Sequence, residues 1–176
     1  MAIEQGEGDD RTIMLIDCGL MFPDADMHGI DLVLPDFSYL RDNARRIAAL
    51  VATHGHEDHV GGIQYLLRDN DGIGHLRDDP LPIYGAALTL GLARNRIDEA
   101  GLLGRCDMRA VNDNESVEIG PFTVEFIPVT HSVPHAHAIV VHTSQGIILH
   151  SGDWKLDLTP VDGRRTDLGR LGQLTA

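Results

Sequence analysis

The sequence lacks the usual marks of secreted and membrane-spanning proteins. Only two of its 176 residues are cysteines, Cys18 and Cys106, and they lie far apart in the sequence. So few cysteines argue against a disulfide framework and fit a reducing cytoplasm, where we expect both to be small buried residues. No apolar run approaches the roughly 20 residues of a membrane span, and the acidic first residues do not form a signal peptide. We therefore expect a cytoplasmic protein that makes no contact with a membrane.

Basic residues are also scarce. The chain has 14 Lys and Arg residues against 27 Asp and Glu, which gives a net charge of −13. Non-specific binding to nucleic acid normally uses a basic face, so the composition disfavours a nucleic-acid substrate. It does not exclude one, because divalent ions bound at a site would add positive charge where a substrate binds.

The hydrophobic pattern is that of one domain with a sizeable core. Hydrophobic residues make up 43% of the chain, and no internal repeat is present. Residues 1–10 are polar, and we expect them to be loose. Apolar runs predict strands over residues 12–19, 48–52, 82–85, 108–111, 116–119, 122–129, 138–143 and 146–150. Helices are predicted over residues 41–48 and 86–100, and another is expected to begin near Ile63.

The densest cluster of metal-ligand side chains follows the apolar run at 48–52. It contains His54, His56, Asp58 and His59, on a predicted strand-to-helix turn. Residues two apart on an extended segment point to the same side, so His54 and His56 can reach one metal ion. Asp58 and His59 come after the turn and can face a second ion. Imidazole with carboxylate suits zinc best and manganese, magnesium or iron less specifically, whereas a polar loop with scattered histidines is the alternative.

Two further strand ends carry candidate ligands. His131 follows the run at 122–129, and Asp153 follows the run at 146–150. We expect His54, His56 and His131 to bind one ion, and Asp153 to bridge it to the second. A water activated by the two metals would then be the nucleophile, with Asp58 to orient it or accept its proton. Asp58 and Asp153 are therefore the predicted catalytic residues.

The remaining histidines and one lysine have less specific surroundings. We expect His28 and His75 to be solvated, and His142 and His150 to be structural, with His150 close to the site by position. His135 and His137 either line the cleft or donate a hydrogen bond to a ligand. Lys155 is either a surface charge or a contact for a substrate phosphate.

The pattern His54-x-His56-x-Asp58-His59 resembles the signature of the metallo-β-lactamase superfamily. The chain further resembles the first part of the ribonuclease J family, in the β-CASP branch of that superfamily. The segments that carry this resemblance are Leu15–Gly19, Asp31–Leu40, His54–Leu67, Val129–Pro134 and Gly152–Lys155. The long loop over residues 20–40 is the more diagnostic part, because many hydrolases share the histidine cluster.

The resemblance implies an α/β (α+β) fold, an αββα sandwich that is incomplete here: a first half-sandwich with flanking helices. It implies a partial domain over residues 11–176, truncated before the β-CASP insert, so that one face of its sheet would be exposed. It also implies a zinc-dependent cytoplasmic ribonuclease with endonuclease and 5′–3′ exonuclease modes in RNA processing and decay, commonly a homo-oligomer. His135 replaces an Asp of the family pattern, and Trp154 replaces a Phe.

Two other functions stay open at this point. One is a metallo-β-lactamase-fold hydrolase of a small ester, lactone or thioester, which the acidic charge favours and the segment 31–40 disfavours. The other is an inactive metal-binding fragment, because the family's last histidine ligand of the second ion and its RNA 5′-end contacts belong to parts that are missing here.

Overall fold

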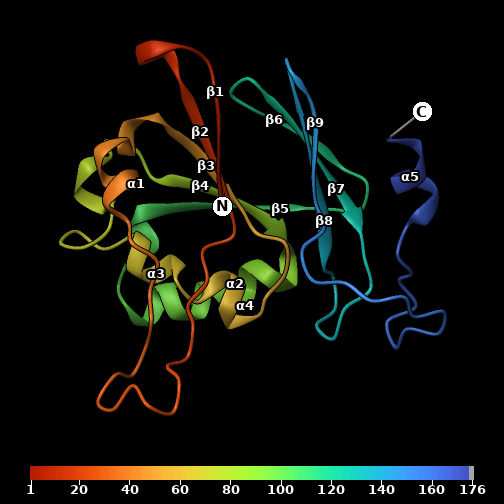
Figure 1. Cartoon of the computed structure of the whole chain (residues 1–176), viewed down its shortest axis with the longest axis horizontal. Helices are drawn as coiled ribbons and strands as arrows, with labels where there is room; N and C mark the ends of the chain where they lie inside the picture. Colours follow the sequence, from red (N-terminus) through yellow and green to blue (C-terminus); the bar gives the residue numbers. More distant parts are fainter. Residues whose placement is uncertain (175–176) are drawn as a thin grey trace.

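A computed structural model, which describes residues 1–174, places two β-sheets face to face (Figure 1). The first sheet has the strand order β1-β2-β3-β4-β5, and the second has the order β6-β7-β8-β9. The strands are β1 (Ala2–Gln5), β2 (Thr12–Ile16), β3 (Ile47–Val51), β4 (Leu81–Ala86), β5 (Cys106–Val111), β6 (Ser116–Ile119), β7 (Phe122–Pro128), β8 (His137–Thr143) and β9 (Gly146–His150). The predicted α/β sandwich is confirmed, and both of its sheets are present.

Helices cover the outer face of the first sheet (Figure 1). They are α1 (Ser38–Asp42), α2 (Glu57–Val60), α3 (Ile63–Leu66) and α4 (Ala87–Glu99), with 3-10 turns η1 (Gly8–Asp10), η2 (Ala44–Arg46), η3 (Gly74–Leu76) and η4 (Leu103–Arg105). Strands β2 to β5 run parallel, and the inner strands β2, β3 and β4 are buried on both faces. Along β2, Ile13 and Leu15 pack under the helices, whereas Met14 and Ile16 face the second sheet. This alternation is the two-residue period of a strand, and it places β2 between two cores.

The second sheet is an antiparallel meander whose outer face is covered less completely. Val124 and Phe126 of β7 face the first sheet, and Ile127 faces outward, where α5 (Leu168–Gln173) packs. Arg170 of α5 forms a bidentate pair with Glu125 on that outer face, at 2.6 and 2.8 Å. The edge strand β9 exposes apolar side chains at residues 147–149. The second helical layer of the sandwich is therefore reduced, within residues 1–174, to the single short helix α5.

Two sequence predictions are wrong in detail. Residues 1–10 are not loose, because β1 pairs antiparallel with β2 and buries Ile3 between the sheets. The segment 41–48 is not one helix either: α1 ends at Asp42, η2 follows, and β3 already begins at Ile47. At residues 2–5 and from Ile47 onward, pairing with β2 decides the conformation, and this tertiary contact outweighs the local sequence preference. Helix α5, near the end of the chain, was not predicted.

The ends of several strands meet at one end of the sandwich. The loops after β2 and β3 come from the first sheet, and the loops after β7 and β9 come from the second (Figure 1). This is the end at which α/β folds tend to build their sites. None of the helices within residues 1–174 is long and apolar enough to cross a membrane.

Candidate metal centre

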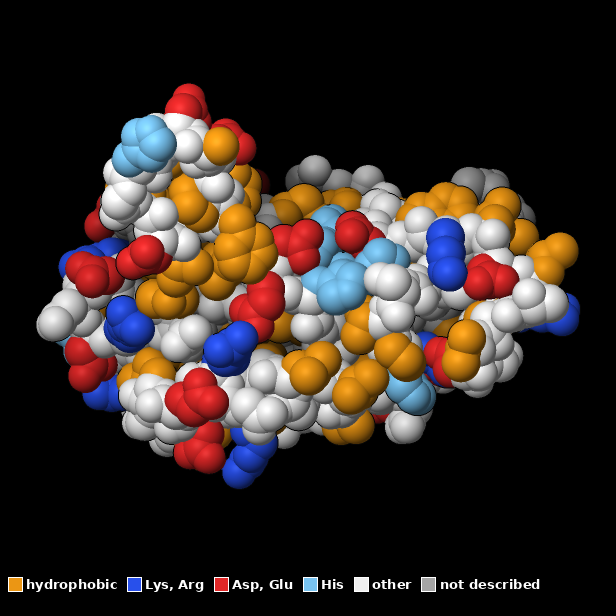
Figure 2. Space-filling view, turned by 90° about the horizontal axis from the view of Figure 1, so that it is seen from below, with side chains coloured by type: hydrophobic (Ala, Val, Ile, Leu, Met, Phe, Trp, Pro, Cys, Tyr) orange, Lys and Arg blue, Asp and Glu red, His pale blue; other side chains and the backbone are white. Residues whose placement is uncertain are grey.

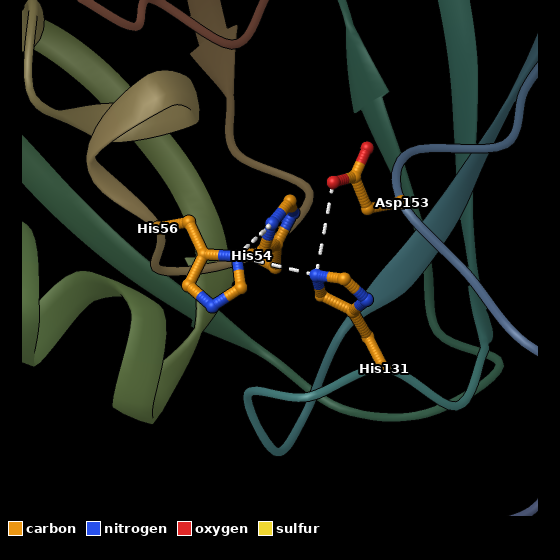
Figure 3. Close-up of side chains that lie close together, drawn as sticks. All are labelled: His54, His56, His131 and Asp153. Carbon is orange, nitrogen blue, oxygen red and sulfur yellow. Dashed lines mark hydrogen bonds and ion pairs between the residues drawn. The ribbon is translucent and has the colours of Figure 1, made fainter. Parts of the chain in front are cut away.

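The structure brings all six predicted ligand side chains to this end of the sandwich. They come from the loop after β3, from α2, and from the loops after β7 and β9: His54, His56, Asp58, His59, His131 and Asp153. Figure 3 shows four of them, with the three imidazoles and the Asp153 carboxylate pointing toward one another. The donor atoms fall into two groups that could each hold a metal ion, and Asp153 belongs to both.

The first group consists of His54, His56, His131 and Asp153. The His56 Nδ1 atom lies 3.1 Å from His54 Nε2 and 3.2 Å from His131 Nε2, which is 3.7 Å from Asp153 Oδ2. Two ligands of a tetrahedral zinc ion, with bonds of about 2.0–2.1 Å, lie about 3.3 Å apart. The spacing and the chemistry of these four donors therefore fit one tetrahedral ion.

The second group consists of Asp58, His59 and Asp153. The His59 Nε2 atom lies 3.5 Å from Asp153 Oδ1 and 3.8 Å from Asp58 Oδ2. Asp153 thus turns one carboxylate oxygen toward each group, as a bridging ligand does. Three donors leave at least one coordination position open, which is the arrangement of a catalytic site rather than a closed structural one.

Asp17, which no sequence motif singled out as a site residue, anchors this centre from the end of β2. Its Oδ1 accepts a hydrogen bond from the Thr53 N–H at 2.8 Å. Its Oδ2 accepts hydrogen bonds from the Thr53 hydroxyl and from His59 Nδ1, both at 2.8 Å. Asp17 has a positive φ of 56°, which is uncommon outside glycine. The sequence did carry a signal for Asp17, because it is a carboxylate directly after an apolar strand. The same signal pointed to Asp153.

The contacts of Asp17 fix which ring nitrogen His54 and His59 present to a metal. The Thr53 hydroxyl donates its only hydrogen to Asp17, so at 3.0 Å it accepts one from His54 Nδ1. His59 donates its Nδ1 hydrogen to Asp17 directly. Both imidazoles therefore keep the Nε2 lone pair free for a metal, as ligating histidines require.

Electrostatics favour neutral imidazoles at the first group. Burial, and the repulsion from His59 and His131, lower the pKa of His54 to about 4. Burial and His56 likewise lower the pKa of His131. His59 differs: burial alone would lower its pKa, but the hydrogen bond to Asp17 and the nearby carboxylates raise it. Since a metal binds the neutral ring, an ion that binds His59 must displace the proton that this raised pKa favours.

Backbone contacts between the loop after β2 and helix α2 hold the second donor group in place. Cys18 donates its N–H to the His59 carbonyl at 2.8 Å, and Gly62 donates to the Cys18 carbonyl at 2.9 Å. A Cβ atom added to Gly19 would overlap the backbone carbonyl of Asp58. Only glycine therefore lets the loop after β2 lie against α2.

The other residues named from the sequence lie at varied distances from the centre. His150 lines a cavity of ≈ 410 Å³ together with Asp58 and His59, and its Nδ1 accepts the Gly152 N–H at 3.1 Å. Cys18 lines the same cavity, and burial raises the pKa of its thiol to about 12. The remaining residues are outside both donor groups: His28, His75, His135, His137, His142 and Lys155. His28 and His75 are exposed, whereas His137 is buried and bonded to Asp113. His142 lies beside Glu125, and Lys155 pairs with Asp157.

Comparison with known proteins gives the family of the chain. The family model described as a beta-lactamase superfamily domain matches residues 12–162. The chain belongs to the beta-lactamase superfamily. Within the superfamily, its similarity is to enzymes named ribonuclease J, at 45% identity over 93% of this chain for the Synechocystis sp. protein and 41% over 93% for that of Thermus thermophilus. The predicted resemblance to ribonuclease J is thereby confirmed, although the chain spans only 24% and 28% of those two relatives.

Two solved structures are similar in fold at low sequence identity. The metallo-beta-lactamase fold protein YhfI from Bacillus subtilis is 20% identical, with a TM-score of 0.56 over 87% of this chain and 54% of that chain. Zn(2+)-bound PqqB from Methylobacterium extorquens is 15% identical, with a TM-score of 0.52 over 84% of this chain and 47% of that chain. At such identities the likeness supports the sandwich fold and carries no further argument about activity.

Proposed function

We propose that this chain is the metal-binding part of a zinc-dependent ribonuclease of the ribonuclease J type, which hydrolyses RNA phosphodiesters. The observation that carries the proposal is the shared carboxylate of Asp153, which turns one oxygen toward each of two donor groups. The names of the relatives support the substrate class, and the histidine-rich donor set supports zinc over magnesium. Endonuclease and 5′–3′ exonuclease modes, RNA processing, a cytoplasmic location and a homo-oligomeric parent belong to the same proposal.

The protein's own groups have distinct tasks in this hydrolysis. Two divalent ions, when bound, lower the pKa of a water and polarise the phosphodiester. Asp58 is the side chain placed to orient that water and accept its proton, because its carboxylate is exposed at the open second group. Asp17 and Thr53 hold His59 and His54 in the ligating tautomer. Asp153 sets the spacing between the two groups.

The ligand assignment is tested by metal content. Asp153→Ala should lose most of the bound metal, because both groups share this carboxylate. His75→Ala is the matched control, since His75 is exposed and outside both groups, and it should lose none. Equal loss from the two variants would contradict the assignment.

Activity is tested next, on the zinc-loaded chain with 5′-monophosphorylated RNA. Cleavage by the parent chain that persists in His75→Ala and disappears in Asp58→Asn, together with the metal of the second group, supports the ribonuclease. Turnover of a small ester, lactone or thioester without RNA cleavage would support a different hydrolase of the superfamily. Two bound ions without any turnover would leave a metal-binding module.

A further inference from the structure

The first donor group is assembled from both sheets, and two of its ligands lie in separate loops of the second sheet. Figure 2 shows histidine and carboxylate side chains gathered in the middle of this end of the molecule. His54 and His56 share the loop after β3, whereas His131 follows β7 and Asp153 follows β9. The distance of 3.7 Å between His131 Nε2 and Asp153 Oδ2 therefore depends on contacts between these two loops.

Thr130, the residue before His131, is where the two loops meet. It is only 4% exposed, and its carbonyl accepts the Lys155 N–H at 2.8 Å. Lys155 lies two residues after Asp153, so this bond joins the backbone beside one ligand to the backbone beside the other. The remaining polar groups of Thr130 bond to residues 164–166, in the tail that follows the Asp153 loop.

Thr166 bonds to both loops through one hydroxyl group. Its Oγ1 accepts the Thr130 N–H at 2.9 Å. It donates its single hydrogen to the Lys155 carbonyl at 3.3 Å, with the Thr130 hydroxyl at 3.4 Å as the alternative acceptor. The Thr130 hydroxyl in turn accepts the Thr166 N–H at 3.1 Å and donates to the Arg164 carbonyl at 3.2 Å. Every polar group of Thr130 is thus paired, and two of the three pair with Thr166.

Arg164 anchors this part of the tail to the sandwich. Its guanidinium pairs with both carboxylate oxygens of Asp113, in the loop between β5 and β6. Asp113 also bonds to His137 Nε2 at 2.9 Å, and the His137 N–H donates to the Thr53 carbonyl at 2.9 Å. Figure 1 shows the blue tail running beside the second sheet. Thr166 is therefore held by a network that reaches β8 in the second sheet and the loop after β3 in the first.

We propose that Thr166 is a positioning residue of the metal centre, whose hydroxyl joins the His131 loop to the Asp153 loop and so sets the distance between these two ligands. It acts through the backbone of Thr130 and Lys155 and belongs to neither donor group. The inference rests on the metal centre of the proposed function and not on the identity of the substrate. It adds a residue that no ligand motif contains.

The inference is tested by two substitutions at this one position. Thr166→Val keeps the shape of the side chain and removes the hydroxyl, whereas Thr166→Ser keeps the hydroxyl. In zinc titration against a chromophoric chelator, Thr166→Val should bind zinc about twofold to tenfold more weakly, the range that one net hydrogen bond contributes. Thr166→Ser should bind zinc like the parent chain.

The spectrum of the Co²⁺-loaded chain separates ligand positioning from general stability. The visible absorption of Co²⁺ depends on the arrangement of its ligands, so Thr166→Val should change this absorption and Thr166→Ser should not. Thr123→Val is the matched control, because the Thr123 hydroxyl bonds to Glu118 at the opposite end of β7 from His131. It should leave both the zinc affinity and the Co²⁺ spectrum unchanged.

A second control addresses the stability of the tail. Arg170→Gln weakens the other anchor of the tail, the pair with Glu125, which lies away from both ligand loops. Its zinc affinity should remain that of the parent chain. If Arg170→Gln binds zinc as weakly as Thr166→Val, the loss reflects the stability of the tail alone and the role assigned to Thr166 is wrong.

The other outcomes separate this inference from the proposed function. If folded Thr166→Val keeps the zinc affinity or the Co²⁺ spectrum of the parent, Thr166 does not position the ligands, although the metal centre stands. If Thr166→Val does not fold, the hydroxyl serves the fold and the inference is also wrong. A parent chain without bound metal would overturn both proposals. RNA cleavage enters neither measurement, so a chain that binds zinc and cuts no RNA would refute only the ribonuclease.

Discussion

Replacement of Asp17 by Asn tests whether this carboxylate sets the tautomer of His59. An Asn side chain has the same size and can still accept the Thr53 N–H through its oxygen. Its NH₂ group would then face the Thr53 hydroxyl and the His59 Nδ1 hydrogen, where Asp17 now accepts both. The favourable response is for His59 to move its hydrogen to Nε2, the atom that faces Asp58 and Asp153. A protonated Nε2 cannot bind a metal.

The expected magnitude follows from the position of Asp17 behind the ligands. Removal of such a hydrogen-bond partner typically weakens metal binding about 10- to 100-fold, or about 1.4–2.7 kcal/mol. The loss should fall mainly on the second ion, since His54 reaches Asp17 only through Thr53. Burial and the charge of Asp17 have opposite effects on the His59 pKa, so Asp17→Asn should also make His59 harder to protonate.

The assay is zinc titration of the metal-free protein against a chromophoric chelator, with circular dichroism to verify folding. Asp36→Asn is the matched control, because Asp36 lines the same cavity as Asp17 and, within residues 1–174, accepts hydrogen bonds from Ser38 alone. It should bind zinc like the parent chain. If folded Asp17→Asn binds both ions within twofold of the parent, Asp17 does not set the tautomer, and the role assigned to it in the second donor group is wrong.

Two further predictions concern the fold. Gly19→Ala should lower the free energy of unfolding and the metal content together, because the new methyl group would overlap the Asp58 carbonyl. In urea titration, Gly91→Ala should instead raise stability by about 0.5–1 kcal/mol, since Gly91 lies within α4 with open space around it. The hydrogen bonds from Arg170 hold the pKa of Glu125 below its ordinary value of 4.5. The stability that the Arg170–Glu125 pair contributes is fully present above the ordinary pKa of Glu125. It is lost as the pH falls through the lower pKa that Glu125 has in the folded protein. Glu125→Gln should therefore remove part of the acid-induced loss of stability, whereas Glu118→Gln, at an exposed position on β6, should leave it unchanged.

The order of secondary structure and the candidate ligands were readable from local sequence. Short apolar runs predicted β7 and β8 within a residue of their observed bounds, because a strand buried on both faces is apolar along most of its length. The six candidate ligands follow strands, and histidine and aspartate side chains at such density are typical of a metal site. The family resemblance could be drawn from the same segments.

Tertiary structure decided what local pattern could not. The polar segment at residues 1–10 forms β1 only because the free edge of β2 is available for pairing and Ile3 can be buried between the sheets. Helix α5 depends on the pairing of Arg170 with Glu125, 45 residues away in sequence. The role of Asp17 depends on a contact with His59, 42 residues away. Periodicity reports which face of an element is buried, but a hydrogen bond between distant loops exists only once the sheets have placed those loops together.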